Sequence, residues 1–375
     1  MNRRTSALRA SGLLLAAAAL CLLLLWRHAT ALDLLCRLTV REAGFLLPAP
    51  AAQSAAPQTT KAETTTAPTE PPPETTDAPT QAAKSAQALT ATPDDIAALI
   101  QKAKRTDTGK KAGAVFTKTY TTEGVTDEAG AVRIKNLCKA QIDPAALLRQ
   151  KADLTVTDGK PCVLIFHTHT TESYQYLDRG YYTSAVPTRD SDPGRNMVRV
   201  GDEICAELEA MGYRVLHDRT IHDARYTGAY AHSRESVLAY LKKYPSLQVL
   251  LDVHRDAIQQ QDGTKIKPTA TVGGKKAAQL MIISGCQEGA VTDFPDWKQN
   301  LVFALQLQKK LETAFPGLTR PLFFDPRRYN MNLSHCSLLI EVGSDSNTLE
   351  EAAYSGRLLG RALGELLGDY KQEKA

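Results

Sequence analysis

The sequence has few of the residues that build a disulfide scaffold or a thiolate metal site. Its seven cysteines stand at positions 21, 36, 138, 162, 205, 286 and 336, and no two of them form a Cys-x-x-Cys pair. The five that follow residue 36 are scattered through core-like stretches, where cysteine usually acts as a small buried apolar residue. We therefore expect neither a disulfide framework nor a zinc site made of cysteine.

An excess of one charge is also missing. Lys and Arg total 45 against 41 for Asp and Glu, a formal net charge of +4 at pH 7. With charges this evenly balanced we expect no basic stripe on the surface, so nucleic acid is not an expected partner. No repeat of fixed period is visible, and no Gly-x-Ser-x-Gly elbow surrounds Ser173, which disfavours repeat architectures and a serine hydrolase.

Long apolar runs are absent after residue 31, so at most one membrane crossing is expected. Within residues 1–31, Arg3, Arg4 and Arg9 precede an apolar stretch from Gly12 to Trp26. A basic start before such a stretch is typical of a cleaved signal peptide or of an uncleaved anchor. Both readings stay open from the residues alone.

Composition divides the rest of the chain. Residues 32–47 are a juxtamembrane segment, and residues 48–93 are so rich in Pro, Thr and Ala that we expect a disordered tether. Residues 94–130 are intermediate and begin with a predicted helix, 94–104. Residues 131–375 are long enough for one sizeable core and form the expected catalytic domain.

Strand and helix patterns alternate through this last segment, which predicts an α/β fold. We expect a three-layer sandwich with a mostly parallel sheet and helices on both faces. A capping box at Thr348 to Glu351 should begin the final helix. The expected strands are 132–136, 154–156, 163–166, 214–216, 249–253, 280–284 and 338–342, and the expected helices are 196–211, 231–244, 297–315 and 348–367.

The most informative motif directly follows the apolar run Val163 to Phe166. It contains His167 and His169, which alternate by two and would share a face in an extended segment, and Glu172, which is close enough to turn back toward them. Histidine nitrogens and carboxylate oxygens are ordinary zinc ligands. The motif therefore indicates a metal site at a strand end.

Two more strands end in chemically capable residues, His254 and Glu341. Groups at the carboxyl ends of parallel strands gather at one edge of an α/β sheet, so these residues could complete one site. Each also has a structural alternative. His254 could pair with Asp252 or Asp256, and Glu341 could form an ion pair with an arginine such as Arg255.

Several segments together resemble the stage II sporulation protein P family, which is related to the zinc-dependent cell-wall amidases. The resemblance covers about residue 162 to the C-terminus. The matching segments are HTHTTESY (167–174), DPGRNMVRVG (192–201), HDRTIHDARYTGAY (217–230), DVHRDAI (252–258), RYN (328–330) and IEVGSDSNTLEEA (340–352).

The resemblance implies roles for the motif residues in a zinc-amidase-like fold. His169 and His254 match the two histidine ligands of Zn²⁺, and Glu341 matches the catalytic base. The related amidases carry their glutamate ligand just before the first helix, where this chain has Arg195 and Asn196. The third ligand is therefore left open between Glu172 and His167.

Further roles follow from the same resemblance. Arg255 is a candidate for stabilising an oxyanion or a substrate carboxylate, with an ion pair to Asp256 as the alternative. His222, Arg328 and Asn330 are candidates for lining the substrate groove. A packed or surface position is the alternative for each.

The resemblance implies a zinc-dependent N-acetylmuramoyl-L-alanine amidase, a hydrolase of linear amide bonds, that acts on peptidoglycan during sporulation and engulfment. It also permits cleavage of peptide cross-links. The implied partners are a membrane-bound lytic transglycosylase and a membrane scaffold. The implied location is the cell membrane, with one transmembrane helix and an extracytoplasmic catalytic domain. The alternative is an inactive cell-wall-binding or complex-organising module.

Overall fold

A computed structural model describes residues 89–106 and 109–372. The predicted segments 1–31 and 32–47, and nearly all of the predicted tether 48–93, lie outside these described residues. Among the residues that it does describe, none of the helices combines the length and the apolar character that a membrane span requires. The prediction of a transmembrane helix and of a single-pass membrane location is corrected accordingly; the segment on which it rested is not described.

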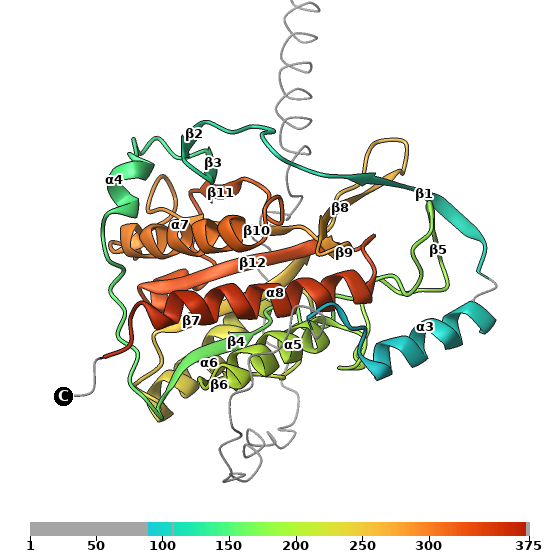
Figure 1. The fold of residues 1–375 in the computed structure, drawn as a ribbon, viewed down its shortest axis with the longest axis horizontal. Coiled ribbons are helices and arrows are strands. Elements are labelled where there is room, and N and C mark those ends of the chain that lie inside the picture. Colours follow the sequence, from blue (N-terminus) through green and yellow to red (C-terminus); the bar gives the residue numbers. More distant parts are fainter. Residues whose placement is uncertain (1–88, 107–108, 373–375) are drawn as a thin grey trace, which may run out of the picture. The chain divides into compact units, whose positions relative to one another are not determined.

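An eight-stranded mixed sheet forms the centre of the described fold (Figure 1). Pairs β10–β11, β11–β3, β12–β7, β7–β4 and β4–β6 are parallel, whereas β2–β3 and β10–β12 are antiparallel. The predicted α/β class is confirmed. In spatial order the strands are β2 (Asp127–Ala129), β3 (Val132–Asn136), β11 (Leu322–Asp325), β10 (Leu280–Gly285), β12 (Cys336–Ser344), β7 (Val249–Asp256), β4 (Pro161–Phe166) and β6 (Arg214–His217).

The two faces of the sheet bury different side chains, because successive residues of a strand point to opposite faces. Val163 and Ile165 of β4 join the main core, which is formed with α5 (Met197–Ala210), α7 (Trp297–Ala314) and α8 (Leu349–Gly368). Leu164 and Phe166 pack in a smaller core with α6 (Ala229–Lys243). The short helix α4 (Pro144–Leu148) packs near α7. The finer expectation of a full three-layer sandwich stays a prediction.

Helix α8 runs against α5 through a row of glycines. A Cβ atom at Gly360 would lie 2.8 Å from the backbone oxygen of Ile204, and one at Gly356 would lie 2.9 Å from that of Val200. Glycine is therefore required for this close approach of two helices. The predicted capping box begins α8, with the Thr348 side chain accepting from Glu351 N and the Glu351 side chain accepting from Thr348 N.

A second, four-stranded sheet was not predicted. Its order is β5 (Tyr181–Thr183), β1 (Lys111–Lys118), β8 (Lys265–Val272) and β9 (Lys275–Ala278). Helix α3 (Asp94–Thr106) precedes β1 and confirms the helix expected at 94–104. The expected strand at 154–156 is wrong, since only an isolated bridge from Val156 to Lys371 forms there. The predicted boundary between 94–130 and 131–375 stays a prediction.

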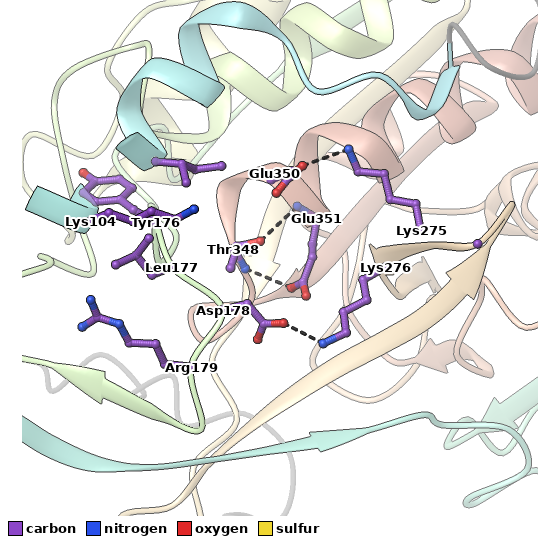
Figure 2. Close-up of a pocket in the computed structure, with 12 residues that line it drawn as sticks. Lys104, Tyr176, Leu177, Asp178, Arg179, Lys275, Lys276, Thr348, Glu350 and Glu351 are labelled. Carbon is purple, nitrogen blue, oxygen red and sulfur yellow. Dashed lines mark hydrogen bonds and ion pairs between the residues drawn. The ribbon is translucent and has the colours of Figure 1, made fainter. Parts of the chain in front are cut away.

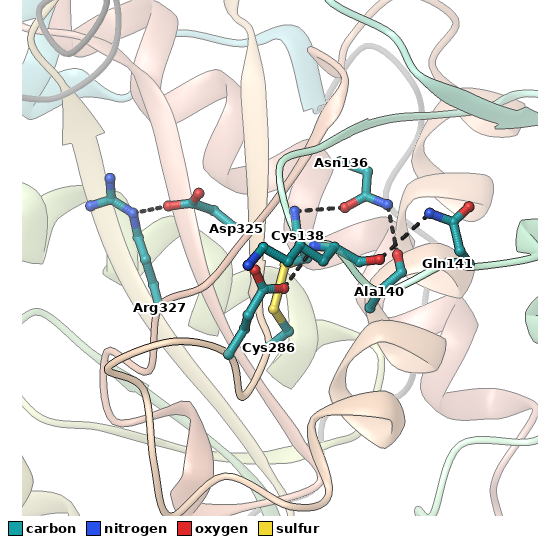
Figure 3. Close-up of a disulfide and its surroundings, with 9 residues drawn as sticks. Asn136, Cys138, Ala140, Gln141, Cys286, Asp325 and Arg327 are labelled. Carbon is teal, nitrogen blue, oxygen red and sulfur yellow. Dashed lines mark hydrogen bonds and ion pairs between the residues drawn. A yellow bond between two sulfur atoms is a disulfide. The ribbon is translucent and has the colours of Figure 1, made fainter. Parts of the chain in front are cut away.

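Two cysteines form a disulfide, which corrects the expectation that none would. Cys138, just after β3, is bonded to Cys286, just after β10 (Figure 3). The bond joins positions 148 residues apart in sequence. Cys162, Cys205 and Cys336 are free and buried, as expected of apolar core residues.

Candidate functional site

Three neighbouring parallel strands bring the predicted residues to one edge of the sheet. His169 follows β4, His254 lies near the end of β7, and Glu341 lies near the end of β12. Glu341 pairs directly with His254 in the β12–β7 register, so their side chains leave the sheet on the same face. A register shift after Glu341 accompanies Gly343, whose φ of 64° suits glycine.

His169, His254 and Glu172 meet at this edge. The ring centroids of His169 and His254 are 5.4 Å apart and the rings are nearly perpendicular. Glu172 Oε2 lies 3.7 Å from His254 Nδ1. All three side chains are buried. Segments that are distant in sequence therefore bring these side chains close together at this edge.

Several buried polar atoms in this cluster have no hydrogen-bond partner among the described residues: His169 Nδ1, His254 Nε2 and Glu341 Oε2. His254 Nε2 nevertheless faces Asp252 Oδ1 at 2.7 Å, so His169 Nδ1 and Glu341 Oε2 are the two atoms that lack a polar partner at short range. Buried polar atoms are usually paired, so unpartnered ones that gather in one place indicate a missing ligand.

Protonation differs between the two rings. Burial, followed by the charge of His254, lowers the pKa of His169 to about 3. Burial also disfavours a charge on His254, yet Asp252 and then Glu172 outweigh it and raise the pKa to about 9. Burial, and next the charge of Asp256, raise the pKa of Glu341 well above the usual range of glutamate.

The side chains of His169, His254 and Glu172 are of the types that bind zinc, but their donor atoms lie farther apart than in a formed metal site. Two imidazoles and one carboxylate are a common catalytic set. Within residues 89–106 and 109–372, however, the one trio of metal-binding side chains with donor atoms all within 4.8 Å is Cys138, Cys286 and Glu288. Two members of that trio share the disulfide, so their sulfurs are not free to bind a metal.

His167 is not part of the cluster. Its Nδ1 lies 2.8 Å from the backbone oxygen of Val253, and its Nε2 lies 2.9 Å from Nε2 of His217. Strand β4 ends at Phe166 and the chain turns at once, so the expected alternation of His167 and His169 on one face does not continue. Of the two alternatives for a third ligand, the geometry favours Glu172.

Arg255 fixes the backbone beside the site. Its Nε donates to the backbone oxygen of Ser173 and its Nη2 to that of Thr188, while its backbone N–H donates to Glu172 Oε2. These contacts fix the segment that carries Glu172. They suit a positioning role better than the expected contact with an oxyanion.

The three predicted groove residues have mainly structural contacts. His222 is buried, with Nε2 3.0 Å from Asp218 Oδ2. Arg328 is directed to the backbone oxygen of Thr292. Asn330 donates to the backbone oxygen of Tyr230, which lies at the start of α6. Asn330 thereby contacts Tyr230, whose ring lies beside His254.

Aromatic rings form a wall over the histidines. Tyr226 stacks on His169 with 4.7 Å between ring centroids and 1° between ring planes. The ring centroids of Tyr230 and His254 are 6.4 Å apart, and Tyr329 stacks on Tyr230 with 5.1 Å between ring centroids. The sequence signalled this wall only through a tyrosine-rich segment, and Tyr329 was missed.

An acid and a base beside the site were also missed. Asp223 Oδ2 lies 3.9 Å from His169 Nδ1 and 2.5 Å from Arg189 Nη1. Arg189 also reaches Glu172, with 3.5 Å between its Nη2 and Oε1. Both residues lie on irregular segments, where no strand or helix periodicity could mark them.

The family of the chain follows from a comparison with models of known families. The model described as "Stage II sporulation protein P (SpoIIP)" matches residues 47–364. The chain belongs to the SpoIIP family. The curated stage II sporulation protein P of Bacillus subtilis (strain 168) is 29% identical to this chain over 231 residues. That match covers 58% of this chain and 54% of the relative, so the chain matches about half the length of this SpoIIP protein.

Solved structures of amidases are also similar to this SpoIIP-family chain at low identity. N-acetylmuramoyl-L-alanine amidase AmiC2 of Nostoc punctiforme is 12% identical, covering 57% of this chain and 98% of its own, with a TM-score of 0.34. The amidase Ami1 from Mycobacterium smegmatis is 13% identical, covering 56% and 99%, with a TM-score of 0.34. The CwlD amidase from Clostridioides difficile, in complex with the GerS lipoprotein, is 12% identical, covering 55% and 99%, with a TM-score of 0.33. At these values the likeness assigns no activity to the chain.

Proposed function

We propose that the chain is a zinc-dependent peptidoglycan hydrolase that cleaves the amide between N-acetylmuramic acid and L-alanine. The observation that carries this proposal is the meeting of His169, His254, Glu172 and Glu341 at one sheet edge, with unpartnered buried atoms on His169 and Glu341. Membership of the SpoIIP family supports the substrate class.

His169, His254 and Glu172 would hold the zinc ion. When bound, zinc supplies a Lewis acid that polarises an amide carbonyl and activates water. Asp252 lies beside His254 Nε2 and orients that ring, and its two hydrogen bonds from Thr168 fix the carboxylate in turn. The backbone N–H of Arg255 orients Glu172 by the same logic.

Glu341 would move the proton. Its Oε2 accepts a proton from the attacking water as the water oxygen bonds to the acyl carbon. The C–N bond then breaks, and Glu341 returns the proton to the departing amine. A buried carboxyl with a raised pKa is suited to hold a proton between these two events. The wall of Tyr226, Tyr230 and Tyr329 restricts water around the reacting amide.

Hydrolysis of purified peptidoglycan by the full chain tests this function. We expect release of peptides with a new N-terminal amine, loss of release with a chelator, and recovery on addition of zinc. Glu341→Gln should lower the rate by at least about a hundredfold. Glu365→Gln, an exposed position in α8, is the matched control and should keep the rate. Release that is insensitive to both the chelator and Glu341→Gln would reject the mechanism.

A second function is favoured by one observation, the spacing of the donors. Because His169, His254 and Glu172 are not gathered as tightly as a formed metal site, the chain could instead bind the cell wall without cutting it. That module would sediment with peptidoglycan and release nothing in the presence of zinc. Cross-link cleavage, a lytic transglycosylase partner and a scaffold partner stay predictions of the family resemblance.

A further inference from the structure

A separate cavity of about 640 Å³ lies beside the start of α8 (Figure 2). Helix α3, the segment that follows Glu172, and the turn between β8 and β9 form its other walls. Four of its lining side chains are basic and three are acidic. They are Lys104, Arg179, Lys275 and Lys276, and Asp178, Glu350 and Glu351.

Lysines already neutralise the acidic side chains. Lys275 Nζ lies 2.9 Å from Glu350 Oε1, and Lys276 Nζ lies 2.6 Å from Asp178 Oδ2. Beneath them Lys267, only 1% exposed, contacts both Glu351 and Asp178. Buried charges are stable only when they are paired, so this network keeps its acids occupied.

Positive charge is left over at the cavity. The Lys104 side chain is exposed and makes no ion pair or hydrogen bond with another residue in the part of the chain that the structure describes. Helix α8 does not add an open N-terminus, because Thr348 and Glu351 cap each other's backbone N–H groups. Attraction for an anion therefore comes from the basic side chains, and a carboxylate suits them.

The cavity is connected to the strand-end site by two short segments. The segment from Glu172 leads to Tyr176 at the cavity wall, and the segment from Glu341 leads to Thr348. Gln175 joins the two segments. Its backbone N–H donates to the backbone oxygen of Asn347, and its backbone oxygen accepts from the backbone N–H of Leu349, both at 2.9 Å. The four residues from Glu172 to Tyr176 span at most about 14 Å, so an extended peptide of four residues could reach from Glu172 to the near wall of the cavity at Tyr176.

We propose that this cavity binds the free carboxylate end of the peptide whose first amide is cut at the strand-end site. The ligand class is a short peptide with free carboxylates. This proposal rests on the proposed function, because it names the part of the substrate that lies beyond the reacting amide. Lys104 is its specificity-determining side chain.

Binding by the zinc-free full chain tests the cavity alone. Titration calorimetry in chelator would compare a soluble wall peptide with free carboxylates against the same peptide with its carboxylates amidated. We expect Lys104→Glu to weaken binding of the free-carboxylate peptide about fivefold, as for an exposed charge contact. Lys104→Arg should keep the affinity. Lys102→Glu makes the same charge change on the same helix outside the cavity lining and should also keep it.

Equal affinity of the wild-type chain and Lys104→Glu, or equal affinity for the free and amidated peptides, would overturn the proposal. Hydrolysis then links the cavity to the reaction. Lys104→Glu should lower kcat/KM about fivefold for a muramoyl substrate with the full peptide and leave a muramoyl-dipeptide unchanged. Equal losses on both substrates would also overturn it. If the wild-type chain cuts neither substrate, the proposed function fails, while the binding result still decides on the cavity.

Discussion

Replacing Asp252 by asparagine should destabilise the protein and weaken its metal site together. Asp252 is 1% exposed and accepts from Thr168 N at 2.8 Å and from Thr168 Oγ1 at 2.6 Å. Its Oδ1 also lies 2.7 Å from His254 Nε2. Asparagine keeps the shape and one acceptor oxygen, but it removes the charge that faces His254.

The size of the effect follows from these contacts. Breaking a buried charge pair by removing one partner costs about 3–5 kcal/mol. Asparagine can still accept from Thr168 N, and a retained bond of this kind offsets about 1 kcal/mol. We therefore expect the free energy of unfolding to fall by about 2–4 kcal/mol. Loss of the group that orients His254 should lower zinc affinity about 10- to 100-fold.

Urea denaturation of the full chain in chelator, followed by circular dichroism, measures the free energy of unfolding. Competition with a chromophoric chelator measures the zinc affinity. Asp94→Asn, at an exposed position in the first turn of α3, makes the same chemical change and should alter neither. A stability change below about 0.5 kcal/mol, the range of ordinary surface substitutions, would refute the view that Asp252 is a buried charge partner.

Three further predictions concern stability. Gly360→Leu should lower the free energy of unfolding by about 1–3 kcal/mol in urea denaturation, because the new side chain would meet α5; full stability would contradict the close helix packing. Cys138→Ala together with Cys286→Ala should cost about 2–4 kcal/mol in the same assay under oxidising conditions, and should cost nothing if the disulfide does not form. Although burial opposes it, hydrogen bonding to His222 lowers the pKa of Asp218 from 3.8 to about 2, so its folded pKa lies below its unfolded value. It therefore contributes about 2 kcal/mol above about pH 4 that is lost as the pH falls toward 2, and Asp218→Asn should remove this part of the acid-dependent destabilisation in denaturation curves.

Much of the main sheet could be predicted because its strands are fully buried. Apolar runs such as 163–166 and 249–253 can hardly form anything but core strands, and the capping box at Thr348 marks the start of α8. The strands expected at 249–253 and 338–342 also predicted His254 and Glu341 at one sheet edge, and the β12–β7 register pairs these two residues. The smaller sheet escaped prediction because β1 alternates between exposed and half-buried residues and β8 contains Lys265 and Lys267 in place of apolar residues.

The missed features of the site are tertiary in origin. The sequence could not show that the chain turns directly after Phe166 and directs His167 toward His217. It could not show that Arg255 points back to the backbone at Thr188. The pairing of Cys138 with Cys286 has no local signal, since the two come together only once β3 and β10 have joined the same sheet.

Zinc content is the most direct test of the central claim that distant strands build one metal site. Elemental analysis would compare the wild-type full chain, His254→Ala and His335→Ala, the last a half-exposed histidine that pairs with Asp153. We predict about one zinc per chain in the wild type and in His335→Ala, and loss of zinc in His254→Ala. Equal zinc in all three proteins, or zinc in none of them after saturation and dialysis, would contradict the account.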